Sequence, residues 1–181
     1  MMNRQPTLPG TLIDLRPLAK ADWDGLFAVA SDKELWAQHP MHTRWQEPVF
    51  RAFFADALAN GGALVAVERA TGAIIGSSQY RGLTDDNGGS VEIGWSMIAR
   101  SHWGGRYNGE MKRLMIAHAL ASVAQVTFRI GETNLRSRRA VEKIGGVLTN
   151  AIDVVPGPDG PAVHVTYAIT REAFASGPLS L

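Results

Sequence analysis

The sequence feature that most constrains the fold is a strand-like run that passes through a glycine-rich turn straight into an amphipathic helix, in the segment Glu92–Met115 (EIGWSMIARSHWGGRYNGEMKRLM). Gly104, Gly105 and Gly109 allow the backbone to turn tightly and to approach a ligand closely. The first free N–H groups of the helix point back toward this turn, where the helix dipole and the side chain of Arg106 add positive charge. A phosphate or pyrophosphate is therefore the expected ligand, and a plain structural connection is the alternative.

Two other phosphate-binding motifs are excluded by the sequence. The chain has no G-x-x-x-x-G-K-[ST] segment, and no G-x-G-x-x-G follows a strand within a parallel βαβ unit. The P-loop and the dinucleotide-binding (Rossmann) interpretations are therefore both rejected.

Hydrophobic periodicity along the whole chain predicts a mixed α/β domain. The predicted strands are Leu12–Arg16, Ala63–Arg69, Ala73–Tyr80, Ser90–Ile98, Val126–Ile130, Val147–Val155 and Val163–Ile169. The predicted helices are Lys20–Ala30, Glu47–Asn60, Gly109–Val123 and Ser137–Ile144. Strands come first and helices are inserted between the later strands, an order that favours a mixed sheet with helices on its faces.

The composition restricts the organisation and the partners of this domain. With 181 residues and 45% hydrophobic residues, the chain is long enough for a single domain, with 1–10 as an N-terminal arm and 171–181 as a C-terminal tail. A net charge of +1 gives no field that would favour nucleic acid or an anionic membrane. No apolar run approaches a membrane span and the start lacks the apolar core of a signal peptide, so we expect a cytoplasmic protein.

Residues that would carry metal or thiol chemistry are scarce. The chain has no cysteine, which excludes disulfides, thiolate metal sites and a cysteine nucleophile. His39 and His42 flank a Pro-Met pair, but spacing places no third ligand near them, so we expect no metal site. Any acyl group that moves here therefore does not rest on a thiol of this protein.

A second motif lies about 30 residues after the glycine-rich turn, in Asn134–Gly146 (NLRSRRAVEKIGG). Together and in this order, the two motifs resemble the GNAT superfamily of acetyl-coenzyme-A N-acetyltransferases, in the branch of the ribosomal-protein N-terminal (Rim-type) enzymes. The resemblance runs from about Leu12 to Ile169. The family's usual loop, [QR]-x-x-G-x-[GA], would place Ser101, Gly104 and Arg106 at its three defined positions, and only the glycine matches.

The resemblance implies a fold and a cofactor site. The fold is a mostly antiparallel, mixed seven-stranded sheet with helices on both faces, splayed between the strands Ser90–Ile98 and Val126–Ile130. The pantetheine arm of acetyl-CoA would lie in this gap like an extra strand. The cofactor-binding residues that follow from the resemblance are Met97 and Ile98 through their backbone, the loop Trp103, Gly104, Gly105, Arg106, Tyr107, Asn108 and Gly109 at the pyrophosphate, Asn134 near the thioester, and Arg139 or Lys143 at the 3'-phosphate. The alternative to a phosphate contact is that Arg139 and Lys143 lie on a solvated helix face.

The expected catalytic residues are Glu92 and Ser137. Alternation along the strand places Val91, Ile93, Trp95 and Met97 on one face and Glu92, Gly94 and Ser96 on the other. With the resemblance, Glu92 is a candidate general base, and otherwise it is a solvated strand residue. Ser137 is either a helix cap or first-turn residue, or the hydroxyl that protonates the leaving thiolate. The second role is considered because the tyrosine that family members often use there is absent between residues 134 and 146.

The predicted function is N-acetyl transfer from acetyl-CoA to a primary amine, which is a peptide N-terminus or a small molecule. Because the chain has no cysteine, the amine should attack the thioester directly in a ternary complex. A base matters most for a lysine-like amine, whose deprotonation at neutral pH costs roughly 4–5 kcal/mol, against about 1 kcal/mol for an α-amine. The alternative is a non-catalytic acyl-CoA-binding or interaction module. A homodimer is left open.

Overall fold

The computed structural model describes residues 2–157 and 159–180, which form one open eight-stranded sheet and five α-helices. The strands are β1 (Leu8–Pro9), β2 (Ile13–Pro17), β3 (Ala63–Glu68), β4 (Ile74–Thr84), β5 (Ser90–Ile98), β6 (Gln125–Gly131), β7 (Val147–Val155) and β8 (Ala162–Thr170). The helices are α1 (Trp23–Ala30), α2 (Glu47–Asn60), α3 (Arg106–Leu120), α4 (Leu135–Lys143) and α5 (Arg171–Ala175). Among these helices, none is long and apolar enough to cross a membrane.

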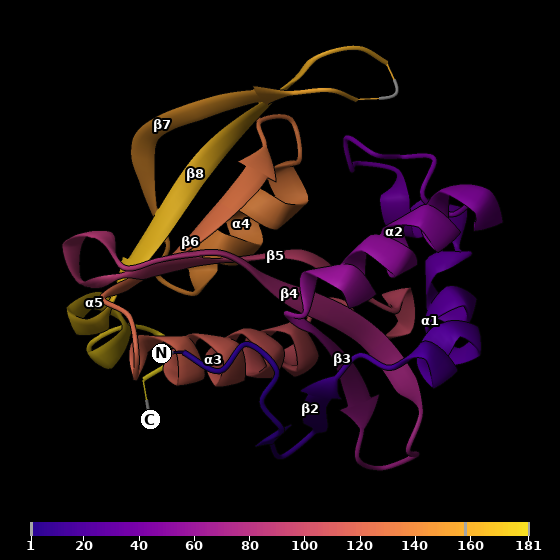
Figure 1. Ribbon diagram of the computed structural model, residues 1–181, viewed down its shortest axis with the longest axis horizontal. Coiled ribbons are helices and arrows are strands. Elements are labelled where there is room, and N and C mark those ends of the chain that lie inside the picture. The colour runs from indigo at the N-terminus through magenta and orange to yellow at the C-terminus, as the bar shows by residue number, and fades with distance from the viewer. Residues whose placement is uncertain (1, 158, 181) are drawn as a thin grey trace.

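The strand order is β1-β2-β3-β4-β5-β6-β8-β7, and every neighbouring pair is antiparallel except β5 with β6. That parallel pair is joined only from Ser90↔Gln125 to Glu92↔Thr127, although both strands continue beyond these residues. The two strands therefore separate, and the sheet opens between them (Figure 1). The splayed mixed sheet expected from the sequence is confirmed.

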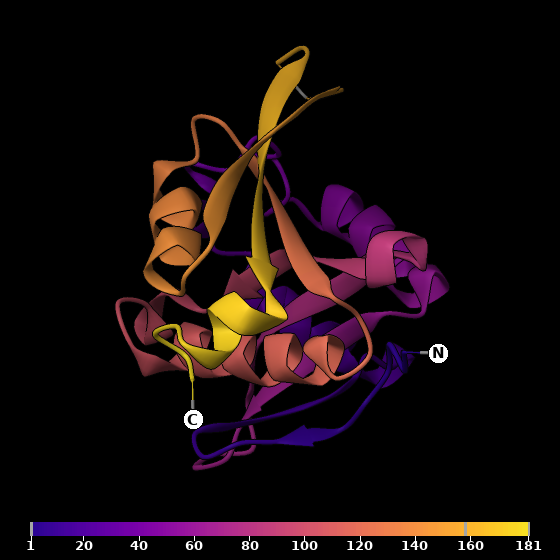
Figure 2. The ribbon, with the colours of Figure 1, turned by 90° about the vertical axis from the view of Figure 1, so that its left-hand side faces the viewer.

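Helices cover both faces of the sheet, and each face has its own apolar core. Helix α3 buries Met111, Met115 and Ile116 against one face, where Val91 and Ile93 also lie. The opposite face packs against α1 and α2, as Figures 1 and 2 show. The members of this second cluster include Leu26, Phe50, Phe54, Val65 and Met97. Strand β5 contributes to both cores, so it separates the two layers.

The expected elements are present, with shifts that have local causes. The eighth strand is the two-residue β1, which lies within the predicted N-terminal arm and pairs with β2. The predicted helix Lys20–Ala30 begins with a 3₁₀ turn, Lys20–Asp22, in which the Asp22 carboxylate accepts a hydrogen bond from the backbone N–H of Ala19. Helix α3 begins at Arg106 rather than at Gly109, and its N-cap is Gly105.

Candidate active site

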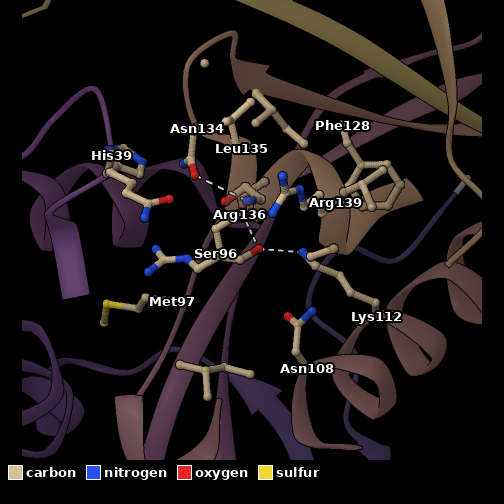
Figure 3. Close-up of a pocket in the computed structure, with 18 of the residues that line it drawn as sticks. His39, Ser96, Met97, Asn108, Lys112, Phe128, Asn134, Leu135, Arg136 and Arg139 are labelled. Carbon is tan, nitrogen blue, oxygen red and sulfur yellow. Dashed lines mark hydrogen bonds between the residues drawn. The ribbon is translucent and has the colours of Figure 1, made fainter. Parts of the chain in front are cut away.

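A cavity of about 1050 Å³ lies where β5 and β6 separate, between the N-terminal half of α3 and helix α4 (Figure 3). It brings together two sequence motifs that lie far apart along the chain. Of the predicted site residues, those that line it are Met97, Ile98, Trp103, Gly104, Gly105, Asn108, Gly109, Asn134, Ser137, Arg139 and Lys143. The structure thus gathers eleven of the fourteen predicted residues around one space.

The glycine-rich turn leaves open space over the start of α3. Gly104 has a φ of +75°, a backbone conformation that residues with a side chain rarely adopt. A Cβ added at Gly104, Gly105 or Gly109 would meet no atom within 4 Å. Gly105, the N-cap of α3, provides no side-chain hydrogen bond to the first N–H groups of the helix. These N–H groups are therefore available to an anion that enters the open space.

Arg106 and Tyr107 lie outside the cavity lining, as does Glu92. Arg106 is exposed at the first position of α3. The Tyr107 hydroxyl donates a hydrogen bond to Glu68 Oε1 over 2.8 Å, and its ring packs edge-on against His102 at 4.6 Å between centroids. Tyr107 is thus bound to the end of β3 and turns away from the cavity. Cofactor contacts from these two side chains stay predictions.

A stacked pair links the turn to α4 across the cavity. The guanidinium of Arg136 lies 4.0 Å from the ring centroid of Trp103. The Trp103 indole in turn donates a hydrogen bond to the backbone oxygen of Ile98 over 2.8 Å, and Arg136 donates one to the backbone oxygen of Leu35. In the sequence Arg136 is one of several basic residues between Asn134 and Gly146, and only the fold places it opposite Trp103.

The start of α4 differs from the prediction. The helix begins at Leu135, and its N-cap is Asn134, whose buried side-chain oxygen accepts a hydrogen bond from the Ser137 backbone N–H over 3.3 Å. Ser137 is therefore not the cap, and it is a first-turn residue of the helix. Its hydroxyl has no hydrogen-bond partner among the described residues, and it lines the cavity together with Arg139 and Lys143. The capping role belongs to Asn134.

Lys112 lines the cavity, and its burial was not predicted from the sequence. Only 5% of its surface is exposed, and its ammonium donates a hydrogen bond to Ser96 Oγ over 2.5 Å (Figure 3). It also lies 5.5 Å from the ring centroid of Phe128. Burial without a carboxylate partner lowers the pKa of Lys112 to about 7.

The buried face that the helical pattern predicts for α3 is wrong by part of a turn, and for this reason the pattern does not predict that Lys112 is buried. The helical periodicity of the predicted helix Gly109–Val123 favours a buried face with Met111, Leu114, Met115, His118 and Ala119. The fully buried residues of the helix are instead Met111, Lys112, Met115, Ile116, Ala119 and Leu120. The sequence does contain a signal for the burial of Lys112. Asn108, Lys112 and Ile116 follow at intervals of four residues, so they lie on one face of the helix.

A β-bulge in β5 overturns the predicted alternation of its side chains. Gln79 and Ser77 of β4 pair with Gly94 and Met97, so three steps on β5 oppose two on β4. Trp95 takes up the extra residue with a φ of +52°. After the bulge, Ser96 faces Lys112 of α3, and Met97 packs with the core on the α1 and α2 side. Trp95 and Met97 therefore do not share a face with Val91 and Ile93.

Glu92 and Trp95 line a second, smaller cavity of about 250 Å³. Burial raises the pKa of the Glu92 carboxyl above its ordinary value, and the nearby Arg129, 3.5 Å away, opposes this rise. The residues that line both this cavity and the large one are His39, Pro40, Trp95, Arg129 and His164. The two cavities are therefore neighbours that meet at the bulge.

Comparison with known proteins agrees with this arrangement. Residues 13–147 match the sequence profile described as the acetyltransferase (GNAT) domain. No curated protein sequence matches the chain significantly. Among solved structures, a GCN5-related N-acetyltransferase from Brucella melitensis superposes with a TM-score of 0.83 at 16% identity, over 95% of this chain and 81% of the other.

Two further structures with a similar fold contain CoA compounds. RimJ of Mycobacterium smegmatis, in complex with CoA-disulfide, has a TM-score of 0.74 at 17% identity, over 99% of this chain and 94% of that one. Spermidine N-acetyltransferase of Vibrio cholerae, in complex with CoA and spermine, has a TM-score of 0.71 at 10% identity, over 92% of this chain and 100% of that one. At these identities the likeness shows the fold alone.

Proposed function

Because the chain belongs to the GNAT acetyltransferase family and is thus an acetyl-CoA-dependent acyltransferase, we propose that it transfers the acetyl group to a primary amine in a ternary complex. The amine is a peptide N-terminus or a small molecule. The observation that carries the proposal is the meeting of two cavities at the bulge around Trp95. One has the open helix N-terminus, and the other has a buried carboxylate.

The large cavity is the proposed acetyl-CoA site. The pyrophosphate would lie on the N-terminal N–H groups of α3 above Gly104 and Gly105, where open space and the helix dipole both favour an anion. The pantetheine arm would pass between β5 and β6 along Met97 and Ile98. Arg139 and Lys143, one helical turn apart on α4, are exposed at this cavity and suit the 3'-phosphate.

Glu92 is the proposed general base. The amine nitrogen forms a bond to the thioester carbon, the carbon–sulfur bond breaks, and the amine proton passes to Glu92 directly or through water. A carboxylate with a raised pKa is a stronger base than an exposed one, which suits the removal of a proton from the amine. The CoA thiolate then takes a proton from the Ser137 hydroxyl or from water. No step passes through a covalent enzyme intermediate.

We also propose that the enzyme is cytoplasmic and forms a homodimer. A cytoplasmic enzyme agrees with the sequence-based expectation. A homodimer is supported by the edge strand β7, which exposes the apolar side chains of Val147, Leu148, Ile152 and Val154.

A thermal-shift and thiol-release experiment tests the proposal. CoA and acetyl-CoA should raise the melting temperature more than ATP or NAD, because stabilisation follows RT ln(1 + [L]/Kd) and is about 2.7 kcal/mol at a hundredfold excess over Kd. Acetyl-CoA should then release free thiol with at least one member of an amine panel. A non-catalytic module would give the thermal shift and no thiol. An equal response to ATP would contradict the proposed cofactor site.

A further inference from the structure

Arg44 is a nearly buried cation in the chain segment between the 3₁₀ helix Lys33–Trp36 and α2. Only 8% of its surface is exposed. Its guanidinium lies 4.5 Å from the ring centroid of Phe53 and 5.2 Å from that of Trp36. Aromatic faces on both elements thus hold the side chain in place, and Arg44 lines the smaller cavity with Glu92.

The positive charge of Arg44 has no counter-charge among the described residues. No described carboxylate lies within ion-pair distance of it, and its side chain makes no hydrogen bond to a described residue. None of its nitrogens is both buried and unpaired, so the guanidinium reaches the accessible space of the cavity that it lines. Burial and the neighbouring Arg81 lower the pKa of Arg44 to about 10, which leaves it charged at neutral pH. A buried charge that no protein group neutralises is costly, so it marks a place where a ligand can supply the missing anion.

The other groups around this cavity do not replace that anion. Glu92 is already opposite Arg129, which also lies 3.7 Å from Asp153. Burial lowers the pKa of His39 to about 3, so His39 is neutral and adds no second cation beside Arg44. The cavity therefore offers one carboxylate that can take a proton. Of its two arginines, Arg129 is shared between two carboxylates, and Arg44 is the one whose charge no described carboxylate balances.

We propose that the acceptor carries a carboxylate in addition to its amine, and that Arg44 binds this carboxylate while Glu92 faces the amine. The inference rests on the proposed function and names its substrate class. A guanidinium binds a carboxylate through two parallel hydrogen bonds, which a point charge does not provide. The cavity volume of about 250 Å³ equals roughly eight water volumes, which is enough for the end of an amino acid or a peptide. Polyamines, which bring only positive charge, are disfavoured.

Matched acceptor pairs test this inference. Each pair differs in one anionic group: lysine and 1,5-diaminopentane, phenylalanine and phenethylamine, and a C-terminally amidated dipeptide with glutamate or glutamine at its second position. Phosphoethanolamine and ethanolamine form a separate phosphate arm. The wild-type enzyme should have a kcat/KM about 10-fold or more higher for the carboxylate member of at least one pair.

Arg44→Gln should abolish this preference by raising KM for the carboxylate member, while KM for the member that lacks this carboxylate changes by less than about 2-fold. The matched control is Arg51→Gln: Arg51 also stacks on an aromatic ring, 4.2 Å from the centroid of Trp23, but it is exposed and lines neither cavity. Arg51→Gln should keep the wild-type ratio. Arg44→Lys keeps the charge and should retain part of the preference. Because each ratio compares two substrates on one enzyme, partial loss of folded protein cancels.

The outcomes separate this inference from the proposed function. Thiol release with amines but without a carboxylate preference, or an equal loss on both members of a pair in Arg44→Gln, would overturn the role of Arg44 and leave the transferase intact. A preference confined to phosphoethanolamine would overturn the carboxylate assignment. A CoA thermal shift without thiol release from any acceptor would overturn both. If neither Arg44 variant folds, the wild-type ratios of kcat/KM within each acceptor pair decide whether the acceptor carries a carboxylate.

Discussion

Lys112 and Arg44 are both buried cations, and they lie on opposite sides of β5. Lys112 comes from α3 and has only serine hydroxyls as hydrogen-bond partners, and its pKa falls to about 7. Arg44 lies between aromatic rings on the side of α2, and burial lowers its pKa only to about 10. The difference follows from the two groups: an ammonium is strongly hydrated and loses its proton when buried, whereas a weakly hydrated guanidinium stacked on aromatic faces remains charged.

This difference separates the two substrate sites chemically. On the cofactor side, Lys112 carries less than a full charge near neutral pH, which suits the uncharged pantetheine arm and thioester. On the acceptor side, the permanent charge of Arg44 suits an anion. Substitutions on one side of β5 should therefore change the kinetics of one substrate and leave those of the other nearly unchanged.

The largest expected effect is that of Glu92→Gln, on the acceptor side. The substitution keeps the shape and removes the basicity, so kcat should fall by roughly 10²-fold or more near neutral pH, with CoA affinity unchanged. Raising the pH should recover much of the rate, because more of the amine arrives neutral. Steady-state kinetics and a CoA titration measure both quantities. A parallel loss of CoA affinity would mean that the two sides are not separate.

Next in size is Arg139→Ala, on the cofactor side. A phosphate contact far from the thioester binds the ground state and the transition state alike, so KM for acetyl-CoA should rise about 10-fold while kcat changes little. Arg106→Ala is the comparison, because Arg106 lies outside the cavity lining and should have the smaller effect. A fall in kcat at unchanged KM would contradict the assignment.

Lys112→Met tests the cost of the buried amine. Because the folded-state pKa is lowered, folding is penalised below the unfolded-state pKa of 10.5, and the penalty is complete below about pH 7. The variant should thus be more stable than wild type at pH 7, by at least about 1.4 kcal/mol, the value of one pKa unit. Denaturant unfolding at several pH values measures this gain, which should shrink toward pH 10.5. A gain in stability that does not change with pH would show that the pKa of Lys112 is not lowered in the folded protein.

The smallest expected effect is that of Arg129→Gln on the pH profile. Arg129 holds the pKa of Glu92 down against burial, so its removal should move the acidic limb of kcat/KM to higher pH. In wild type this limb should already lie above the ordinary carboxyl value of 4.5. A shift to lower pH would show that Glu92 does not control the limb.

Local sequence patterns predicted elements well but predicted their three-dimensional contacts less well. Helix α2 and strands β5 and β7 have the predicted bounds, because their periodicity and flanking glycines are local signals. The side to which Trp95 points was not predictable, because the bulge depends on the register between β4 and β5. The burial of Arg44 was not predictable either, because the two rings that enclose it come from separate elements that only the fold brings together.

The central claim, that acetyl-CoA and an amine react directly in one ternary complex, is tested most directly by mass spectrometry of a complete reaction. Acetyl-CoA labelled in its acetyl group is mixed with the enzyme and the acceptor pairs, and thiol, acetylated amine and intact protein mass are followed together. The account predicts one labelled acetyl-amine for each thiol released, no thiol without amine, and an unchanged protein mass. Accumulation of an acetylated protein that then acetylates the amine, or CoA binding with no acetyl-amine, would contradict it.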